Sequence, residues 1–159
     1  MNLAIVTGAS SGLGYSIITK LIKDGWEVHG LSRRKAVLES KHYTQHLLDL
    51  SDSHAVESFS KNILKDLVQS SYPRVALINN AGSIDPIGAL SKHNFEAIQK
   101  SFSLNVTTAL WLMGSLLKWR QEEVKIVNIS SGAASKAYEG WSIYCSAKAA
   151  LRMASMVKL

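Results

Sequence analysis

The chain has 159 residues, of which 47% are hydrophobic and 19% are charged, and it carries a formal net charge of +6. This composition excludes a disordered chain and predicts a single domain, residues 1–159, that is large enough to bury a core. Because the lysines are scattered and no basic run alternates with aromatic residues, the charge indicates a solvated basic surface and no nucleic-acid partner.

Short apolar runs alternate with amphipathic runs from end to end. Strands are expected at residues 3–7, 27–31, 43–48, 75–78 and 124–130. Helices are expected from about residue 13, over 53–69, over about 102–119 and from about residue 142. Strands that alternate with helices predict an α/β fold, namely a Rossmann-type, doubly wound parallel sheet with helices on both faces.

The turn after the first expected strand reads Thr-Gly-Ala-Ser-Ser-Gly-Leu-Gly over residues 7–14. Glycine permits a tight turn and close approach of the backbone to a pyrophosphate, whose charge then lies at the N-terminus of the following helix. A glycine cluster is often only a turn, but its position between a strand and an amphipathic helix favours dinucleotide binding. The lack of a Gly-Lys-Ser/Thr sequence in this turn argues against a nucleoside-triphosphate loop.

The second expected strand is followed by Ser32, Arg33 and Arg34, where an NAD-binding domain would carry an acid for the ribose hydroxyls. An arginine here can pair with the 2′-phosphate of NADP. One such charge-assisted bond contributes about 1.5–3 kcal/mol, roughly a 10- to 150-fold preference. The alternative is an exposed basic loop. The missing acid favours NADP(H) as the cofactor.

Three further polar positions follow or interrupt expected elements. Asp49, in Leu48-Asp49-Leu50, can accept a hydrogen bond from an adenine amino group, although an acid here can also cap the next helix. Residues 79–82 read Asn-Asn-Ala-Gly, in which glycine allows close approach to the cofactor and asparagine ties neighbouring loops; alone, this is simply a turn. Asn105 interrupts a helical pattern, where it can bend the helix or hold a water, or else merely face solvent.

The other candidate ligands suggest neither a metal nor a disulfide. His42 and His46 lie in or beside an expected strand, where four residues span about 13 Å and cannot share one ion. Cys145 is the only cysteine, so no internal disulfide forms. With no leader-like start and no apolar run of membrane-spanning length, we expect a cytoplasmic protein with no membrane partner.

The expected fifth strand leads to Ser131, and the last helical run contains Tyr144 and Lys148. Because they are four residues apart on a helix, the phenol and the ammonium lie on one face. At about 4 Å and an effective dielectric near 20, the ammonium stabilises the ionised phenol by roughly 4 kcal/mol, which suits a general acid/base at neutral pH. Ser131 can donate to the carbonyl oxygen that Tyr144 protonates. Taken separately, these residues could be a buried serine and a surface tyrosine.

In chain order, TGASSGLG, the acid in LDLSD, NNAG, Asn105, IVNISS and YCSAK resemble the motifs of the short-chain dehydrogenase/reductase family. The signature Trp141-Ser-Ile-Tyr144-Cys145 together with Lys148-Ala-Ala looks most like the branch of sepiapterin and benzil reductases. The resemblance implies NADPH-dependent reduction of a ketone or diketone, with Tyr144 as the catalytic acid and Lys148 on the nicotinamide ribose. It also implies that Ser131 orients the substrate, that Asn105 supports a water-linked proton relay, and that the full-length protein is a homodimer or homotetramer.

Together, the motifs predict one catalytic set and one cofactor-binding set. The catalytic residues are Ser131, Tyr144, Lys148 and Asn105. The cofactor-binding residues are Gly8, Ser10, Ser11, Gly12, Leu13, Gly14, Arg33, Arg34, Asp49, Leu50, Asn80, Ala81 and Gly82, together with Tyr144 and Lys148.

The resemblance also bears on the length of the chain. Family members continue with two more strands, a helix and a substrate-covering loop, whereas this chain reaches Leu159 with no glycine cap on its last helix. We therefore expect a partial chain, a Rossmann domain incomplete at its C-terminus, whose fifth strand is an exposed apolar edge. Two alternatives to an active reductase stay open: a non-catalytic NADP-binding regulator and an inactive truncated fragment.

Overall fold

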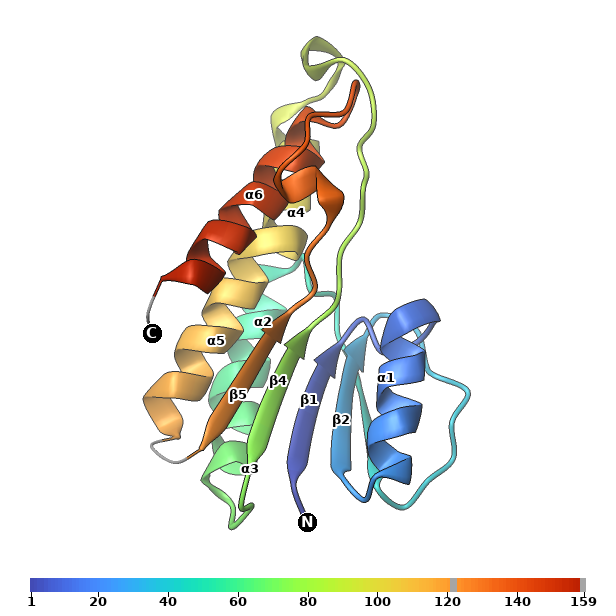
Figure 1. The fold of residues 1–159 in the computed structure, drawn as a ribbon, viewed down its shortest axis with the longest axis vertical. Coiled ribbons are helices and arrows are strands. Elements are labelled where there is room, and N and C mark those ends of the chain that lie inside the picture. The colour runs from blue at the N-terminus through green and yellow to red at the C-terminus, as the bar shows by residue number, and fades with distance from the viewer. Residues whose placement is uncertain (121–122, 158–159) are drawn as a thin grey trace.

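The computed structural model describes residues 1–120 and 123–157, which form one five-stranded parallel sheet flanked by helices (Figure 1). The strands are β1 (Leu3–Thr7), β2 (Glu27–Ser32), β3 (Tyr43–Leu47), β4 (Val75–Asn79) and β5 (Val124–Asn128). They pair in the order β3-β2-β1-β4-β5, and every pair is parallel. The order changes direction between β1 and β4, which is the switch point where ligands bind in open α/β sheets. The predicted fold class is confirmed.

Helical segments connect these strands, and several of them run on without a break. They are α1 (Gly12–Lys23); α2 (Ser53–Phe59), the π-helical η1 (Ser60–Leu64) and α3 (Lys65–Gln69); the 3-10 turn η2 (Leu90–Lys92); α4 (Phe95–Phe102), the π-helical η3 (Ser103–Thr107) and α5 (Thr108–Trp119); the 3-10 turn η4 (Gly132–Ala134); and α6 (Ser142–Met156). Among the described residues, no helix is long and apolar enough to cross a membrane.

Two predicted boundaries are wrong by more than one residue. The helix expected to start near Phe102 begins at Phe95, because the Asn94 side chain caps it by accepting a hydrogen bond from the Ala97 N–H at 2.8 Å. The fifth strand ends at Asn128 and does not extend to Ser130, because the chain leaves β4 there and continues towards η4. The other strands match their predicted ranges to within one residue.

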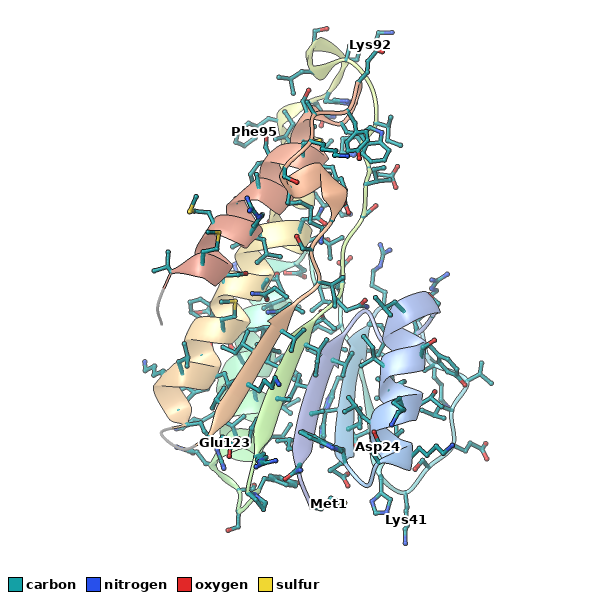
Figure 2. The ribbon with its side chains drawn as sticks, viewed as in Figure 1. Met1, Asp24, Lys41, Lys92, Phe95 and Glu123 are labelled. Carbon is teal, nitrogen blue, oxygen red and sulfur yellow. The ribbon has the colours of Figure 1, made fainter. Side chains whose placement is uncertain are left out.

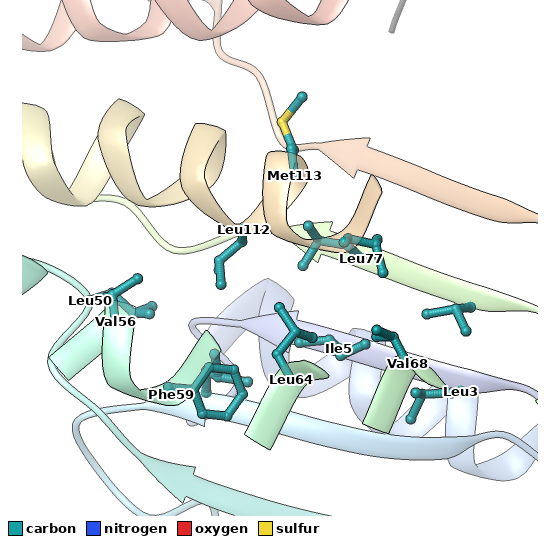
Figure 3. Packing of buried hydrophobic residues seen from close by; sticks show 13 residues of the cluster. Leu3, Ile5, Leu50, Val56, Phe59, Leu64, Val68, Leu77, Leu112 and Met113 are labelled. Carbon is teal, nitrogen blue, oxygen red and sulfur yellow. The ribbon is translucent and has the colours of Figure 1, made fainter. Parts of the chain in front are cut away.

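The two faces of the sheet form two separate cores, and β1 supplies both of them. Leu3 and Ile5 pack on the face covered by α2, η1, α3 and α5 (Figure 3), whereas Ala4 and Val6 pack on the face covered by α1. This alternation follows from the two-residue period of a strand. Full burial of a leucine or isoleucine contributes about 1.5–3 kcal/mol, so β1 anchors the domain from its centre.

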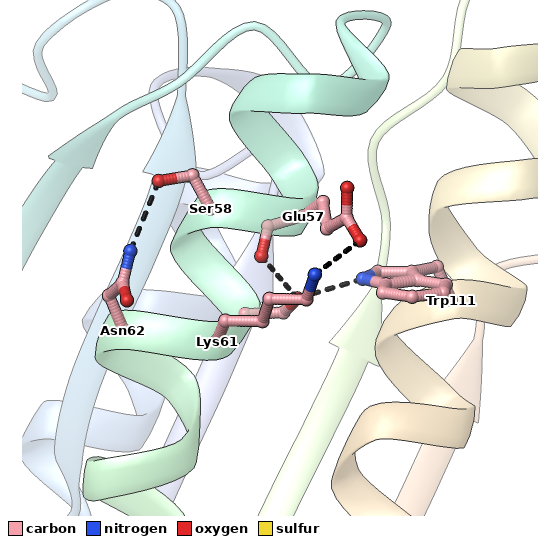
Figure 4. Close-up of polar contacts among 6 residues, drawn as sticks. Glu57, Ser58, Lys61, Asn62 and Trp111 are labelled. Atoms are coloured by element: carbon pink, nitrogen blue, oxygen red, sulfur yellow. Dashed lines mark hydrogen bonds and ion pairs between the residues drawn. The ribbon is translucent and has the colours of Figure 1, made fainter.

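A polar contact joins the π-helical segment η1 to α5 (Figure 4). The Trp111 indole N–H donates to the buried Ser60 Oγ at 2.8 Å, and Ser60 in turn donates to the Glu57 carbonyl oxygen at 2.9 Å. The neighbouring Lys61–Glu57 pair is solvent-exposed, and such pairs contribute little to stability. The buried contact therefore fixes the distance between η1 and α5.

The carboxyl ends of all strands point towards the end of the molecule that carries α4 and the start of α6 (Figure 1). Lys92 and Phe95 lie at this end, while Met1, Asp24 and Glu123 lie at the opposite end (Figure 2). Strand β5 is one edge of the described sheet, as expected. Its side chains at Ile126 and Val127 are half-buried and not exposed, because they pack against the two cores.

Candidate functional site

The predicted phosphate turn is tied to the loop that follows β4 by hydrogen bonds around Thr7. Thr7 Oγ1 accepts from the backbone N–H groups of Asn80 and Ala81, each at 2.9 Å, and the Asn80 amide donates to the Thr7 carbonyl oxygen at 3.0 Å. At Gly14 a Cβ atom would lie 2.1 Å from the Gly8 carbonyl oxygen, so only glycine fits there. The turn therefore packs directly on its own helix and on the next loop.

A cavity of about 560 Å³ opens beside this turn, at the carboxyl ends of β1, β2 and β4. It brings together ten of the predicted cofactor-binding residues: Gly8, Ser10, Ser11, Arg33, Arg34, Asp49, Leu50, Asn80, Ala81 and Gly82. The other five do not line the cavity: Gly12, Leu13 and Gly14 begin α1, and Tyr144 and Lys148 lie on α6. Segments of the chain between Ser32 and Leu104 thus converge with the turn on one space.

Charged side chains of both signs line the cavity at its second-strand side. Asp49 Oδ1 accepts from the Ser51 N–H at 2.9 Å and from Ser51 Oγ at 2.7 Å. These bonds lower the pKa of Asp49; burial opposes the shift, and the charges of Arg33 and Lys100 add to it. Arg34 donates to Ser11 Oγ at 3.4 Å. Asp49 is therefore an ionised acceptor, as adenine recognition would need.

Sequence reasoning missed the wall of this cavity that α4 and η3 supply. Ala97, Lys100, Ser101 and Leu104 line it, and Lys100 adds a third positive side chain. They were missed because the helix was expected to start at residue 102. The signal that could have located it is Asn94, a typical N-cap residue three positions before Ala97.

Asn105 lies in the π-helical turn η3 and is only 1% exposed. Its Oδ1 accepts from the Ser83 N–H at 3.2 Å, and its Nδ2 donates to the Ser83 carbonyl oxygen at 2.9 Å and to that of Ser101 at 3.0 Å. The helix is thus distorted at Asn105, in line with the expectation that this residue can bend it. The side chain holds the loop after β4 against the helix.

Gly82 connects the cavity to the predicted catalytic residues. A Cβ atom on Gly82 would lie 2.8 Å from Asn105 Oδ1 and 3.5 Å from Lys148 Nζ. Gly82 itself lines the cavity. The absence of a side chain at this position therefore lets Lys148 and Asn105 come up against the cavity wall.

The predicted Tyr144–Lys148 pair is brought together on α6. Lys148 Nζ lies 5.8 Å from the centroid of the Tyr144 ring and donates to the Ile129 carbonyl oxygen at 3.0 Å. The Lys148 side chain is 4% exposed, and this burial lowers its pKa. The backbone carbonyl at the end of β5 thus fixes the ammonium beside the phenol.

Ser131 stands at the start of η4, which packs against α6. Its Oγ accepts from the Ala133 N–H at 3.2 Å. Because that bond uses an oxygen lone pair, the hydroxyl hydrogen can still be donated to a substrate oxygen.

A row of aromatic rings extends from Tyr144 to the molecular surface. The ring centroids of Trp141 and Tyr144 are 6.0 Å apart in an edge-to-face arrangement, and those of Tyr138 and Trp141 are 4.9 Å apart. Tyr138 is 42% exposed. The Gly88 N–H donates to the Gly140 carbonyl oxygen at 2.9 Å, so the loop after β4 lies beside this row.

The family of this chain follows from its match to known proteins. The short chain dehydrogenase family matches residues 2–157. The chain belongs to this family.

The relatives of this short-chain dehydrogenase chain include two reductases of known activity. Benzil reductase ((S)-benzoin forming) of Bacillus subtilis is 39% identical over 157 residues, which are 96% of this chain and 64% of that protein. Sepiapterin reductase of Xenopus laevis is 31% identical, over 95% of this chain and 65% of that protein. The chain thus spans about two thirds of the length of these two relatives.

Solved structures agree with this assignment. A short-chain dehydrogenase/reductase from Burkholderia vietnamiensis superposes with a TM-score of 0.89 at 35% identity, covering 97% of this chain and 78% of that one. A 4-hydroxyisoleucine dehydrogenase complexed with NADH superposes with a TM-score of 0.82 at 25% identity, covering 98% of this chain and 69% of that one.

Outside the site of this short-chain dehydrogenase, the structure brings together His29 and His46, which are 17 residues apart in the sequence and were not predicted to pair. His29 Nδ1 lies 2.8 Å from His46 Nε2, and the two rings stack. Burial and the nearby charge of His46 lower the pKa of His29 to about 4. His42 instead lies beside Glu27, at 3.4 Å. Within the described residues, no group of three or more His, Cys, Asp or Glu side chains could hold a metal ion.

Proposed function

We propose that this chain is the nucleotide-binding and catalytic part of an NADPH-dependent carbonyl reductase that converts a ketone or diketone to an alcohol. The observation that carries the proposal is the position of Gly82, which lines the cofactor cavity and lies against both Asn105 and Lys148. A nucleotide in the cavity would therefore reach the side chains that can handle a proton.

The residues around the cavity fit a phosphorylated dinucleotide. Gly8, Ser10 and Ser11 of the glycine turn line the cavity just before α1, where a pyrophosphate would meet the helix N-terminus, and Asp49 offers an ionised acceptor to an adenine amino group. Arg33 and Arg34 line the cavity after β2, where an NAD-binding domain carries an acid. NADPH would supply the hydride. Its 2′-phosphate would be held by Arg33 and Arg34, in the way that guanidinium groups bind phosphates.

The proton would come from Tyr144. Lys148 Nζ lies 5.8 Å from the centroid of the Tyr144 ring, and we propose that its charge assists transfer of the phenolic proton to a carbonyl oxygen whose carbon has accepted hydride. Ser131 would donate its hydroxyl hydrogen to the same oxygen and fix its orientation. Asn105 would hold the loop that separates the cavity from α6, and a water-linked relay beside it stays a prediction.

The substrate class rests on the aromatic row and on the relatives. Relatives in Bacillus subtilis and Bacillus cereus are benzil reductases, and benzil is a diketone with two aromatic rings. In this chain, Trp141 and Tyr138 would offer flat apolar surfaces next to the hydroxyl of Tyr144. An aryl-substituted diketone is therefore the substrate class we propose. Assembly as a homodimer or homotetramer and a cytoplasmic location stay predictions.

The test is NADPH oxidation with a panel of aliphatic and aryl diketones, comparing the wild type with Tyr144→Phe. We expect the Phe variant to lose about 10²- to 10⁴-fold in kcat while it still binds NADPH, because only the acid is removed. Equal rates in the two proteins would refute the role of Tyr144. Tight NADPH binding by the wild type with no turnover of any diketone would favour the non-catalytic regulator.

A further inference from the structure

A series of side-chain hydrogen bonds joins the ends of β4 and β5 to the second half of α6. Asn79 Nδ2 donates to Asn128 Oδ1 at 2.8 Å, and Asn128 Nδ2 donates to Ser155 Oγ at 2.8 Å. Ser155 Oγ then donates to the Leu151 carbonyl oxygen at 2.7 Å. Each side chain in the series donates a hydrogen bond to the next group, so the bonds run in one direction and strengthen one another.

The spacing of the attachment points on α6 gives this series a mechanical meaning. Lys148 and Ser155 are seven residues apart, which is about two helical turns, so they lie on the same face and about 10 Å apart. Their partners are adjacent in the chain, because Lys148 contacts the carbonyl oxygen of Ile129 and Ser155 contacts the amide of Asn128. Two attachments at this separation fix both the tilt and the rotation of the helix, which one attachment would not do.

We propose that Asn128 and Ser155 are positioning residues, which orient α6 so that Tyr144 and Lys148 meet the substrate carbonyl. The inference rests on the proposed function. Ser155 is eleven residues beyond Tyr144, about 16 Å along the helix, so it acts through the helix and not by contact with the substrate. Catalysis is sensitive to such orientation, because small displacements of a catalytic group slow the reaction strongly.

The placement of the cofactor cavity makes this role separable from cofactor binding. The residues that line the cavity fall between Gly8 and Leu104, and among the described residues none belongs to β5 or α6. A helix that tilts after loss of the Ser155 bond would therefore leave the adenine half of the cofactor site unchanged. The rate of turnover should fall while NADPH affinity stays constant.

The experiment compares Ser155→Ala, Ser155→Thr and Asn128→Ala with the wild type, with kcat expressed per NADPH-binding site. Ser155→Ala and Asn128→Ala should each lower kcat about three- to ten-fold, with the NADPH Kd within about two-fold of the wild type. The double variant, Asn128→Ala combined with Ser155→Ala, should be no slower than the slower of the two single variants, because both changes break the same series of hydrogen bonds. Ser155→Thr should keep the wild-type kcat, since threonine retains the hydroxyl and can also donate to the carbonyl oxygen one turn back.

Arg152→Ala is the matched control, because it removes an exposed polar side chain from the same half of α6 as Ser155. Its kcat should equal that of the wild type. A purely structural role would appear as fewer NADPH-binding sites with an unchanged kcat per site, and it would overturn the proposal. So would wild-type kcat in Ser155→Ala and Asn128→Ala. If the wild type turns over no carbonyl compound at all, the proposed function fails first, and the positioning role fails with it.

Discussion

The cofactor region, which comprises the cavity-lining residues between 8 and 104, and the catalytic region, residues 129–148, are held by separate sets of contacts. Thr7, next to the cofactor region, receives two backbone N–H groups, and the turn after it has no space for a Cβ at Gly14. In the catalytic region, Lys148 on α6 donates to the Ile129 carbonyl oxygen just after β5, and Ser131 caps a short turn. Among the described residues, the catalytic region contributes none of those that line the cavity. Rate and cofactor affinity should therefore respond to different residues.

The largest expected effect comes from Lys148→Met, which would break the catalytic region. Methionine has a similar length but no charge, and the buried position accepts an apolar chain. We expect kcat to fall about 10²- to 10⁴-fold, because the phenol loses its positive neighbour. Stopped-flow single turnovers and NADPH fluorescence titration would measure the two regions separately.

Lys125→Met on β5 is the control for this change, because it removes an exposed lysine from the strand that leads to the catalytic region. It should leave kcat unaltered. A Lys148→Met enzyme as fast as the wild type would remove the basis for a lysine-assisted tyrosine.

A smaller effect, confined to the cofactor region, is expected from Arg33→Asp combined with Arg34→Ala. The aspartate would repel a 2′-phosphate and could bind the hydroxyls that replace it, so the NADPH/NADH preference should fall roughly 10- to 150-fold. The ratio of kcat/KM values for the two cofactors measures this. Lys35→Ala, which removes the adjacent exposed charge outside the cavity lining, should leave the ratio in place. An unchanged ratio in the double variant would contradict the cofactor assignment.

The smallest effect concerns the strand pair beside the cofactor region, where His29 meets His46. The pKa of His29 is about 4 in the folded protein and 6.5 in the unfolded chain, so the unfolded chain takes up a proton first as the pH falls. Stability contributed by neutral His29 is full above pH 6.5, declines between 6.5 and 4, and is lost below that range. The loss should be on the order of 2–3 kcal/mol, seen in urea unfolding at pH 7 and pH 4.5.

A His29→Gln variant should show a flatter dependence of the free energy of unfolding on pH over this interval. An identical pH dependence in both proteins would mean that the pKa of His29 is the same in the folded and the unfolded chain, and it would contradict this prediction.

Much of the fold could be predicted from the sequence because the signals were local. The apolar run 3–7 and the glycines of the turn specify a strand and its exit without help from the rest of the chain. The spacing of Tyr144 and Lys148 on a helix was also local, and the structure brings them into contact. Such features depend on residues a few positions apart, and a sequence displays them directly.

What the sequence could not supply were contacts set by register and by tertiary packing. The His29–His46 pair arises because β2 pairs with β3 in a register that aligns Leu31 with His46, and nothing in either strand alone encodes it. The link from Asn128 to Ser155 likewise needs the final angle of α6. Lys100 was missed because the helix that carries it was expected to start only at about residue 102, whereas it begins at Phe95.

The hydrogen bonds around Thr7 have a consequence for engineering. The loop that carries Arg33 and Arg34 begins at the end of β2. The hydrogen bonds between Thr7 and the loop after β4 do not involve it. Substitution of Arg33 and Arg34 should therefore cost the turn only the Arg34–Ser11 contact, while the bonds of Thr7 to the loop after β4 remain. The nucleotide preference that we propose for this loop could then be changed by a few surface substitutions, without redesign of the folded core.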